Sequence, residues 1–149
     1  MKLRTRVIAA AVFAAATLTA PATAGADGLP DDGPTIVMTV TNTSDAPMIY
    51  SGDSNEYGRW VDKPATVIAA HATETISAVA TDRRGLGIQV TYTMPGDGHV
   101  ALMSNNYGTG PANADGTRID GPNRHGYSIA SHVGTGFPFM KVTYTVSRP

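Results

Sequence analysis

The sequence predicts an all-β protein, a single-domain antiparallel β-sandwich. Two observations carry this prediction: short segments alternate hydrophobic and polar residues without a helical period, and glycine, proline and asparagine separate them. The clearest alternation lies in residues 85–94, where every second residue from Ile88 to Met94 is hydrophobic. A turn at 95–98 and a returning strand toward Asn106 complete a hairpin. A lone hairpin is barely stable, so it must belong to a larger sheet.

Weaker alternation predicts the other strands. In chain order they are expected at residues 35–42, 48–50, 66–70, 74–81, 126–132 and 140–146. Residues 51–58 are predicted to form a polar loop, and residues 105–126 a long one that is either functional or disordered. The segments 90–93 and 142–145 both read Val-Thr-Tyr-Thr. They are expected to have equivalent roles in facing sheets.

The first 24 residues have the three parts of a secretory signal peptide. Three basic residues fall within the first six, an apolar run covers residues 7–18, and a small-x-small triplet ends at Ala24. The run is short for a membrane span, although an uncleaved anchor is the alternative. The pattern predicts cleavage near Ala24 and a secreted, extracellular protein.

The remaining chain is the size of one domain. Residues 25–34 carry three aspartates and two prolines, which predicts a disordered lead-in before a β-sandwich domain at 35–149. Without the three basic residues of the signal segment, 8 basic and 12 acidic residues remain, a formal net charge of −4. This balance argues against nucleic acid as a partner, because phosphate binding needs a concentrated basic face. The chain has no cysteine, so disulfides do not stabilise it.

The sequence contains no recognisable motif for catalysis or for metal binding. The chain has two glutamates, no cysteine and no Gly-x-Ser-x-Gly elbow, and its four histidines lack ligand spacing. Asp97, Asp115 and Asp120 each precede glycine, which is a turn signature. We therefore expect no enzyme, no catalytic residue, no metal site and no cofactor. Asp–His pairs assembled by folding, and a loosely held Ca²⁺ in residues 105–121, stay open as alternatives.

Aromatic residues supply the candidate binding site. The indole of Trp60 has an apolar body and one N–H donor, which suits a membrane interface or a sugar ring. The neighbouring Arg59 has a planar fork that fits a phosphate headgroup. Tyr57 and Tyr107 lie in predicted loops beside strands. The alternative is structural: Trp60 packs between the sheets, Arg59 is simply exposed, and the tyrosines cover the core.

Several motifs together resemble the aegerolysin-type family, in particular its small bacterial branch, which includes a component of binary insecticidal crystal toxins. The matching features span residues 35–147 and are Asn42, Gly58-Arg59-Trp60 before Pro64, residues 85–92, Asn105-Asn106-Tyr107-Gly108 and residues 142–146. The family's Thr-Gly-Thr-Glu-Gly stretch appears here without its glutamate, at residues 83–88.

The resemblance implies a fold and a function. The fold is a β-sandwich like that of the actinoporins. The ligand is a membrane lipid, with sphingolipid among the candidates, bound alone or together with a larger pore-forming protein that permeabilises membranes.

Three functional hypotheses follow. The leading one is a secreted, non-enzymatic protein that binds membrane lipid through Arg59, Trp60, Tyr57 and Tyr107 and acts as a pore-forming or toxin component. The second is a secreted, lectin-like module that stacks the same aromatics on glycans. The third is a structural secreted protein with no small ligand.

Overall fold

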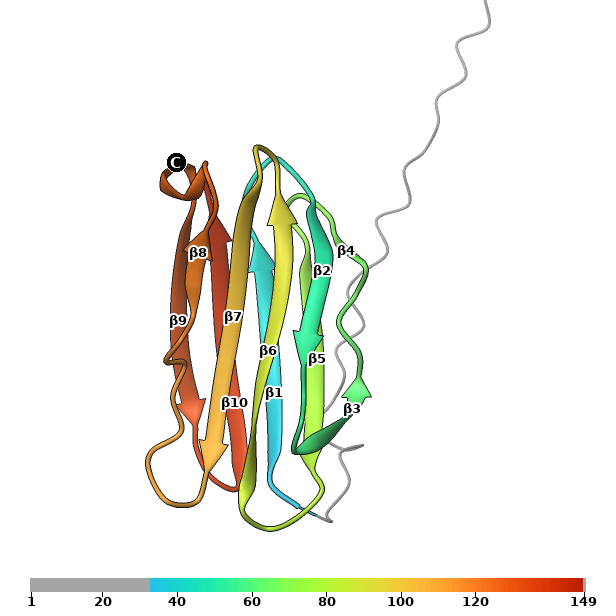
Figure 1. Ribbon diagram of the computed structural model, residues 1–149, viewed down its shortest axis with the longest axis vertical. Helices are drawn as coiled ribbons and strands as arrows, with labels where there is room; N and C mark the ends of the chain where they lie inside the picture. The colour runs from blue at the N-terminus through green and yellow to red at the C-terminus, as the bar shows by residue number, and fades with distance from the viewer. Residues whose placement is uncertain (1–32, 149) are drawn as a thin grey trace, which may run out of the picture.

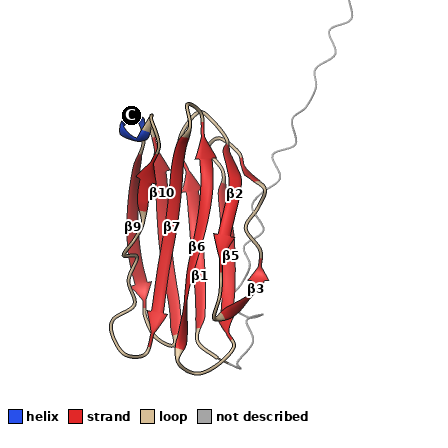
Figure 2. Ribbon diagram, in the orientation of Figure 1, coloured by secondary structure: helices blue, strands red, loops and turns tan. Residues whose placement is uncertain are grey.

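The computed structural model describes residues 33–148, which form two five-stranded sheets packed face to face (Figure 1). Within that range the only helical element is a short 3-10 turn, η2 (Arg124–Gly126) (Figure 2). The predicted signal peptide at 1–24 and all but the last two residues of the predicted lead-in at 25–34 lie outside the described residues. Pro34 already belongs to the fold, because its carbonyl accepts the Ala80 N–H at 2.8 Å.

The strand order confirms the predicted β-sandwich. One sheet has the order β3 (Gly58–Asp62), β5 (Thr73–Ala80), β1 (Thr35–Asn42), β10 (Phe139–Ser147) and β9 (Ser128–Thr135). The other has the order β4 (Val67–Ile68), β2 (Met48–Ser54), β6 (Gly85–Met94), β7 (Gly98–Tyr107) and β8 (Arg118–Asp120).

One strand pair departs from the predicted antiparallel arrangement. β1 and β10 run parallel, whereas the other neighbouring strands run antiparallel. These two strands come from opposite ends of the domain, so no short turn forces them to reverse direction.

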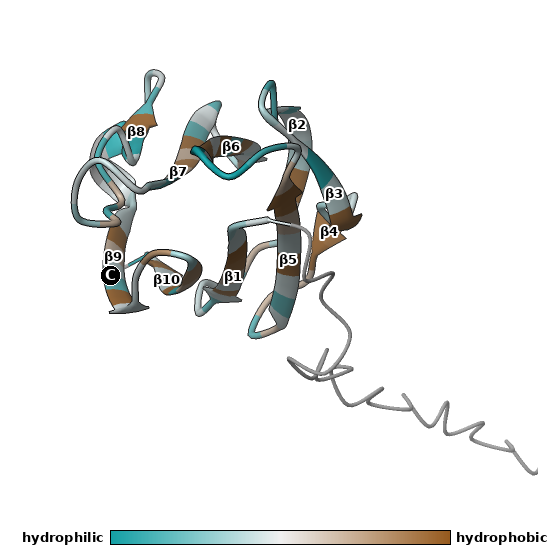
Figure 3. Ribbon diagram, turned by 90° about the horizontal axis from the view of Figure 1, so that it is seen from below, coloured by the Kyte–Doolittle hydropathy of each residue, from teal (hydrophilic) through white to brown (hydrophobic). Residues whose placement is uncertain are grey.

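The core fills the space between the two sheets (Figure 3). Alternate residues of the long strands point inward and are fully buried, as the sequence predicted for the hairpin and for β10. They include Ile36, Met38, Val40, Val90, Tyr92, Leu102, Met140, Val142, Tyr144 and Val146. The two Val-Thr-Tyr-Thr segments lie in different sheets, and both bury their tyrosine.

The two buried tyrosines differ in their hydrogen bonding. The Tyr144 hydroxyl lies 2.9 Å from Ser104 Oγ and donates to the Met103 carbonyl. The Tyr92 hydroxyl has no hydrogen-bond partner among residues 33–148. Burial raises the pKa of both phenols above the ordinary value of 10.0.

The loop predicted at 51–58 is mostly strand and is corrected, whereas the long loop predicted at 105–126 contains one short strand. β2 continues to Ser54 and β3 begins at Gly58, so only residues 55–57 remain of the loop expected at 51–58. The segment expected as a long loop at 105–126 returns along β7. There β8 pairs with β7, and Asn105 forms an isolated bridge with Asn113. A strand of three residues is too short to leave an alternation that sequence reading would detect.

A buried asparagine fixes the loops at one end of the sandwich. The Asn42 Nδ2 donates to the carbonyls of Ala46 at 2.8 Å and Ala69 at 3.0 Å, and more weakly to that of Ile68. Its Oδ1 accepts from the Ser44 N–H at 3.1 Å and hydroxyl at 2.7 Å. One side chain therefore joins the turn after β1 to the connection between β4 and β5.

We predict that Asn42→Ala lowers the free energy of unfolding by about 2–3 kcal/mol, because several buried polar groups lose their partners. Urea denaturation measures this loss. Asn123→Ala is the control, since Asn123 is exposed and makes no side-chain cap bond to η2. Equal stability of the two variants would contradict the structural role of Asn42.

We predict opposite results for removing the two buried tyrosine hydroxyls. Tyr144→Phe should lower the free energy of unfolding by about 1–2 kcal/mol, whereas Tyr92→Phe should leave it unchanged or raise it slightly. In wild type the raised phenol pKa values stabilise the fold below pH 10, and stability falls as pH rises above 10, because the unfolded chain loses these protons first. Tyr92→Phe should reduce this loss of stability at alkaline pH. If stability depended on pH in the same way as in wild type, the buried Tyr92 phenol would not be its cause.

Candidate functional site

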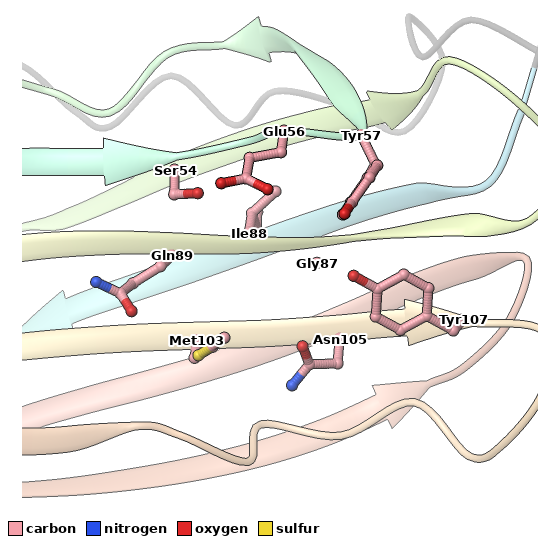
Figure 4. Close-up of a pocket in the computed structure, with 9 residues that line it drawn as sticks. All are labelled: Ser54, Glu56, Tyr57, Gly87, Ile88, Gln89, Met103, Asn105 and Tyr107. Atoms are coloured by element: carbon pink, nitrogen blue, oxygen red, sulfur yellow. The ribbon is translucent and has the colours of Figure 1, made fainter.

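A pocket of about 250 Å³ lies on the outer face of the second sheet, near the end where β6 begins and β7 ends (Figure 4). Three segments form it: the connection from β2 to β3, the first half of β6 and the second half of β7. The lining residues are Ser54, Glu56, Tyr57, Gly87, Ile88, Gln89, Met103, Asn105 and Tyr107.

Two exposed tyrosines form the walls of this pocket. Tyr57 comes from the β2–β3 connection and Tyr107 ends β7, and their side chains are 56% and 37% exposed. Figure 4 shows both hydroxyls directed toward the Gly87 backbone between them. The apolar ring and the polar hydroxyl of each tyrosine are therefore both available to a ligand.

Gly87 provides the space for this arrangement. A Cβ atom at this position would lie 2.7 Å from the Tyr107 hydroxyl and 3.0 Å from Asn105 Oδ1. Such distances are too short for carbon beside oxygen, so a side chain here would displace Tyr107. The glycine thus allows the phenol to approach the β6 backbone closely.

The floor of the pocket combines polar side chains with Met103, and strand pairing fixes their positions. Gln89 pairs with Ser54 on β2 and with Met103 on β7, so the three side chains form a row across the sheet. Asn105 lies beside this row, opposite Gly87. Its Nδ2 donates to Asn113 Oδ1 at 3.0 Å, which fixes the orientation of the amide.

The charges around the pocket are unevenly placed. Glu56 brings a carboxylate to the lining, and no lysine or arginine belongs to it. Arg84 lies in the turn before β6, where its guanidinium Nη2 is 2.6 Å from the Asp82 carboxylate. Hydrogen bonds from Arg84 lower the pKa of Asp82, and Asp82 in turn raises the pKa of Arg84.

Two of the four candidates from the sequence lie elsewhere. Arg59 and Trp60 belong to β3 in the other sheet and do not line the pocket. Arg59 is exposed, whereas Trp60 is half-buried and packs against the core. The structure therefore brings Tyr57 and Tyr107 together and separates Arg59 and Trp60 from them.

Trp60 takes part in a contact between the two sheets. Its indole N–H donates to Asp53 Oδ1 at 3.2 Å, and the Tyr50 hydroxyl donates to Asp53 Oδ2 at 2.5 Å. The hydrogen bond to Asp53 raises the pKa of Tyr50. Asp53 lies on β2 and Trp60 on β3, so this carboxylate joins the sheets at their edge.

The sequence gives no sign that several of the lining residues belong to a pocket. Ser54, Glu56, Gln89, Met103 and Asn105 look like ordinary residues of a solvated sheet face. The detectable signal was Gly87, since glycine within a strand often marks a close approach to the backbone. Among residues 33–148, no three His, Asp or Glu side chains are close enough to hold a metal ion. In the same range no helix is long and apolar enough to cross a membrane.

Comparison with known proteins supports the fold. No protein-family model matches the chain, and no curated protein matches its sequence. The crystal structure of the lipid binding protein Nakanori superposes with a TM-score of 0.61. The match covers 78% of this chain and 72% of Nakanori at 9% sequence identity, so it shows a shared fold.

We predict that Gly87→Ala displaces the exposed Tyr107 side chain but changes the free energy of unfolding by no more than about 0.5 kcal/mol, because the nearest atoms are side-chain ends that can shift. Near-ultraviolet circular dichroism reports the tyrosine environment, and urea denaturation reports the stability. Gly110→Ala is the control, because an added Cβ there would meet nothing within 4 Å. Identical spectra for both variants would contradict the close approach of Tyr107.

Proposed function

We propose that this chain is a secreted, non-enzymatic protein that binds a membrane lipid by its headgroup in the pocket between Tyr57 and Tyr107. The observation that carries the proposal is the convergence of two exposed phenols over Gly87, beside the polar side chains of Ser54, Gln89 and Asn105. Such a pocket offers ring faces and hydrogen-bonding groups within one small volume.

The lining chemistry favours a neutral or zwitterionic headgroup. Ser54, Gln89 and Asn105 supply hydrogen-bonding groups, Glu56 supplies a negative charge, and the tyrosine rings attract cations through their faces. A headgroup ammonium is expected beside Glu56. An anionic headgroup has no basic side chain to meet within the lining.

The finer parts of the proposal rest on the sequence. The signal peptide pattern supports export and cleavage near Ala24. The aegerolysin resemblance supports sphingolipid as the ligand and a role in membrane damage, alone or with a larger pore-forming protein. The lipid binding of the structural neighbour Nakanori agrees with the lipid part.

We predict that the mature protein sediments with vesicles of sphingomyelin, phosphatidylcholine and cholesterol, and that added anionic lipid does not strengthen binding. Tyr57→Ala and Glu56→Gln should weaken binding by roughly tenfold, the effect of losing a buried apolar contact or a charged contact. The control is Ile49→Ala, a side chain with 45% exposure on the first half of β2, away from the pocket.

Other outcomes would contradict the lipid proposal. Binding that rises with anionic lipid and disappears in high salt would indicate nonspecific electrostatic attraction instead. Absence of binding to all vesicles, together with binding to soluble glycans, would support the lectin-like alternative. Release of an entrapped dye by the protein alone, compared with release after adding a larger partner, tests the pore-forming part.

A further inference from the structure

Exposed hydrophobic side chains are unevenly distributed over the molecule. Of the six large ones in residues 33–148, four are aromatic and belong to the end of the sandwich where β6 begins and β7 ends (Figure 1). They are Tyr57, Tyr107, Phe137 at 43% exposure and Phe139 at 56%. The other two are aliphatic, Ile49 and Val67, which face each other on β2 and β4.

The two phenylalanines are held in place by a fixed turn. Phe137 precedes Pro138 in the connection from β9 to β10, and Phe139 begins β10. The Pro138 carbonyl accepts the Thr35 N–H at 2.8 Å and Asn106 Nδ2 at 3.0 Å. The Thr135 hydroxyl donates to the Phe139 carbonyl at 2.7 Å. The backbone therefore presents both rings to solvent with little conformational freedom left to lose on binding.

The exposed aromatics are linked to the pocket. The Phe137 ring lies against Gly108, where an added Cβ would be 3.0 Å from the ring. Gly108 directly follows Tyr107, the wall of the pocket. The apolar surface thus begins at the pocket and continues to the turn at 136–138, which lies at the same end of the fold (Figure 1).

This surface has the composition of a membrane-contacting surface. Exposing two phenylalanine rings to water is unfavourable, and a fixed turn prevents them from folding back onto the core. Aromatic rings are favoured where water meets hydrocarbon. Arg83 and Arg84 lie exposed in the turn before β6 at this same end, where the Arg84 guanidinium is paired with Asp82.

We propose that this end of the sandwich inserts into a lipid bilayer, with Phe137 and Phe139 among the upper acyl chains and Tyr57 and Tyr107 at headgroup level. The inference rests on the proposed lipid-binding function and adds the orientation of the protein, end-on to the membrane. The occupant of this surface is the bilayer itself.

Tryptophan fluorescence tests the insertion directly, because Trp60 is the single tryptophan of the chain. In a Trp60→Phe background, Phe137→Trp places the reporter in the turn, and Ile49→Trp places it away from the aromatic end as the matched control. Vesicles contain phosphatidylcholine, sphingomyelin and cholesterol, with or without brominated acyl chains. We expect vesicles to shift the Phe137→Trp emission to the blue and brominated lipid to quench it, with neither effect for Ile49→Trp.

A sedimentation experiment separates insertion from headgroup binding. The double variant Phe137→Ser, Phe139→Ser should bind about tenfold or more weakly to every zwitterionic vesicle, because it loses apolar burial and leaves the pocket intact. Glu56→Gln should instead weaken binding only to headgroups that carry an ammonium group, which is expected beside Glu56. Sedimentation of the Phe137→Trp variant without quenching would overturn the insertion and leave headgroup binding standing. Absence of sedimentation for wild type with any vesicle would overturn both.

Discussion

The parallel pairing of β1 with β10 is the contact on which the rest of the structure depends. It joins strands from the two ends of the domain, from Thr35 opposite Phe139 to Asn42 opposite Val146. Without it the first sheet would separate into β3–β5–β1 and β10–β9. The Thr43 N–H and hydroxyl both donate to the Val146 carbonyl, at 2.8 and 3.0 Å, and so extend the pairing beyond the strand. The entropic cost of closing so long a loop grows only logarithmically with its length, so an ordinary sandwich core can offset it.

This pairing also fixes the geometry of the aromatic end. Because Thr35 begins β1 beside the start of β10, the turn at Pro138 lies next to it, and Asn106 donates to the carbonyls of both residues at 2.8 and 3.0 Å. Asn106 belongs to β7 in the opposite sheet and is fully buried. Its neighbour Tyr107 is therefore held at a set position relative to Phe137 by buried hydrogen bonds, which makes the site part of the rigid scaffold.

Alternation in the sequence predicted which residues face the core, but it could not predict which strands pair. The hairpin of β6 and β7 follows from its turn, whereas the parallel partner of β1 depends on contacts between distant segments. The sequence does not reveal the pocket for a related reason, since Gln89 and Asn105 look like any solvated strand residues until folding brings the connection carrying Tyr57 into the same lining. The sequence likewise could not show that the Trp60 indole N–H donates to Asp53 from the other sheet.

The pocket and the phenylalanine turn contribute to the proposed lipid complex through different physical effects. Each polar contact in the pocket replaces a contact with water, so it adds only about 1 kcal/mol, although a mismatched headgroup leaves polar groups unsatisfied. Each phenylalanine transferred into hydrocarbon adds about 1.5–3 kcal/mol regardless of the headgroup. Selectivity therefore belongs to the pocket, and most of the binding strength to Phe137 and Phe139. The two effects add only if both surfaces meet one membrane plane, and Asn106 secures this by tying the strand that ends in Tyr107 to the turn that carries Phe137.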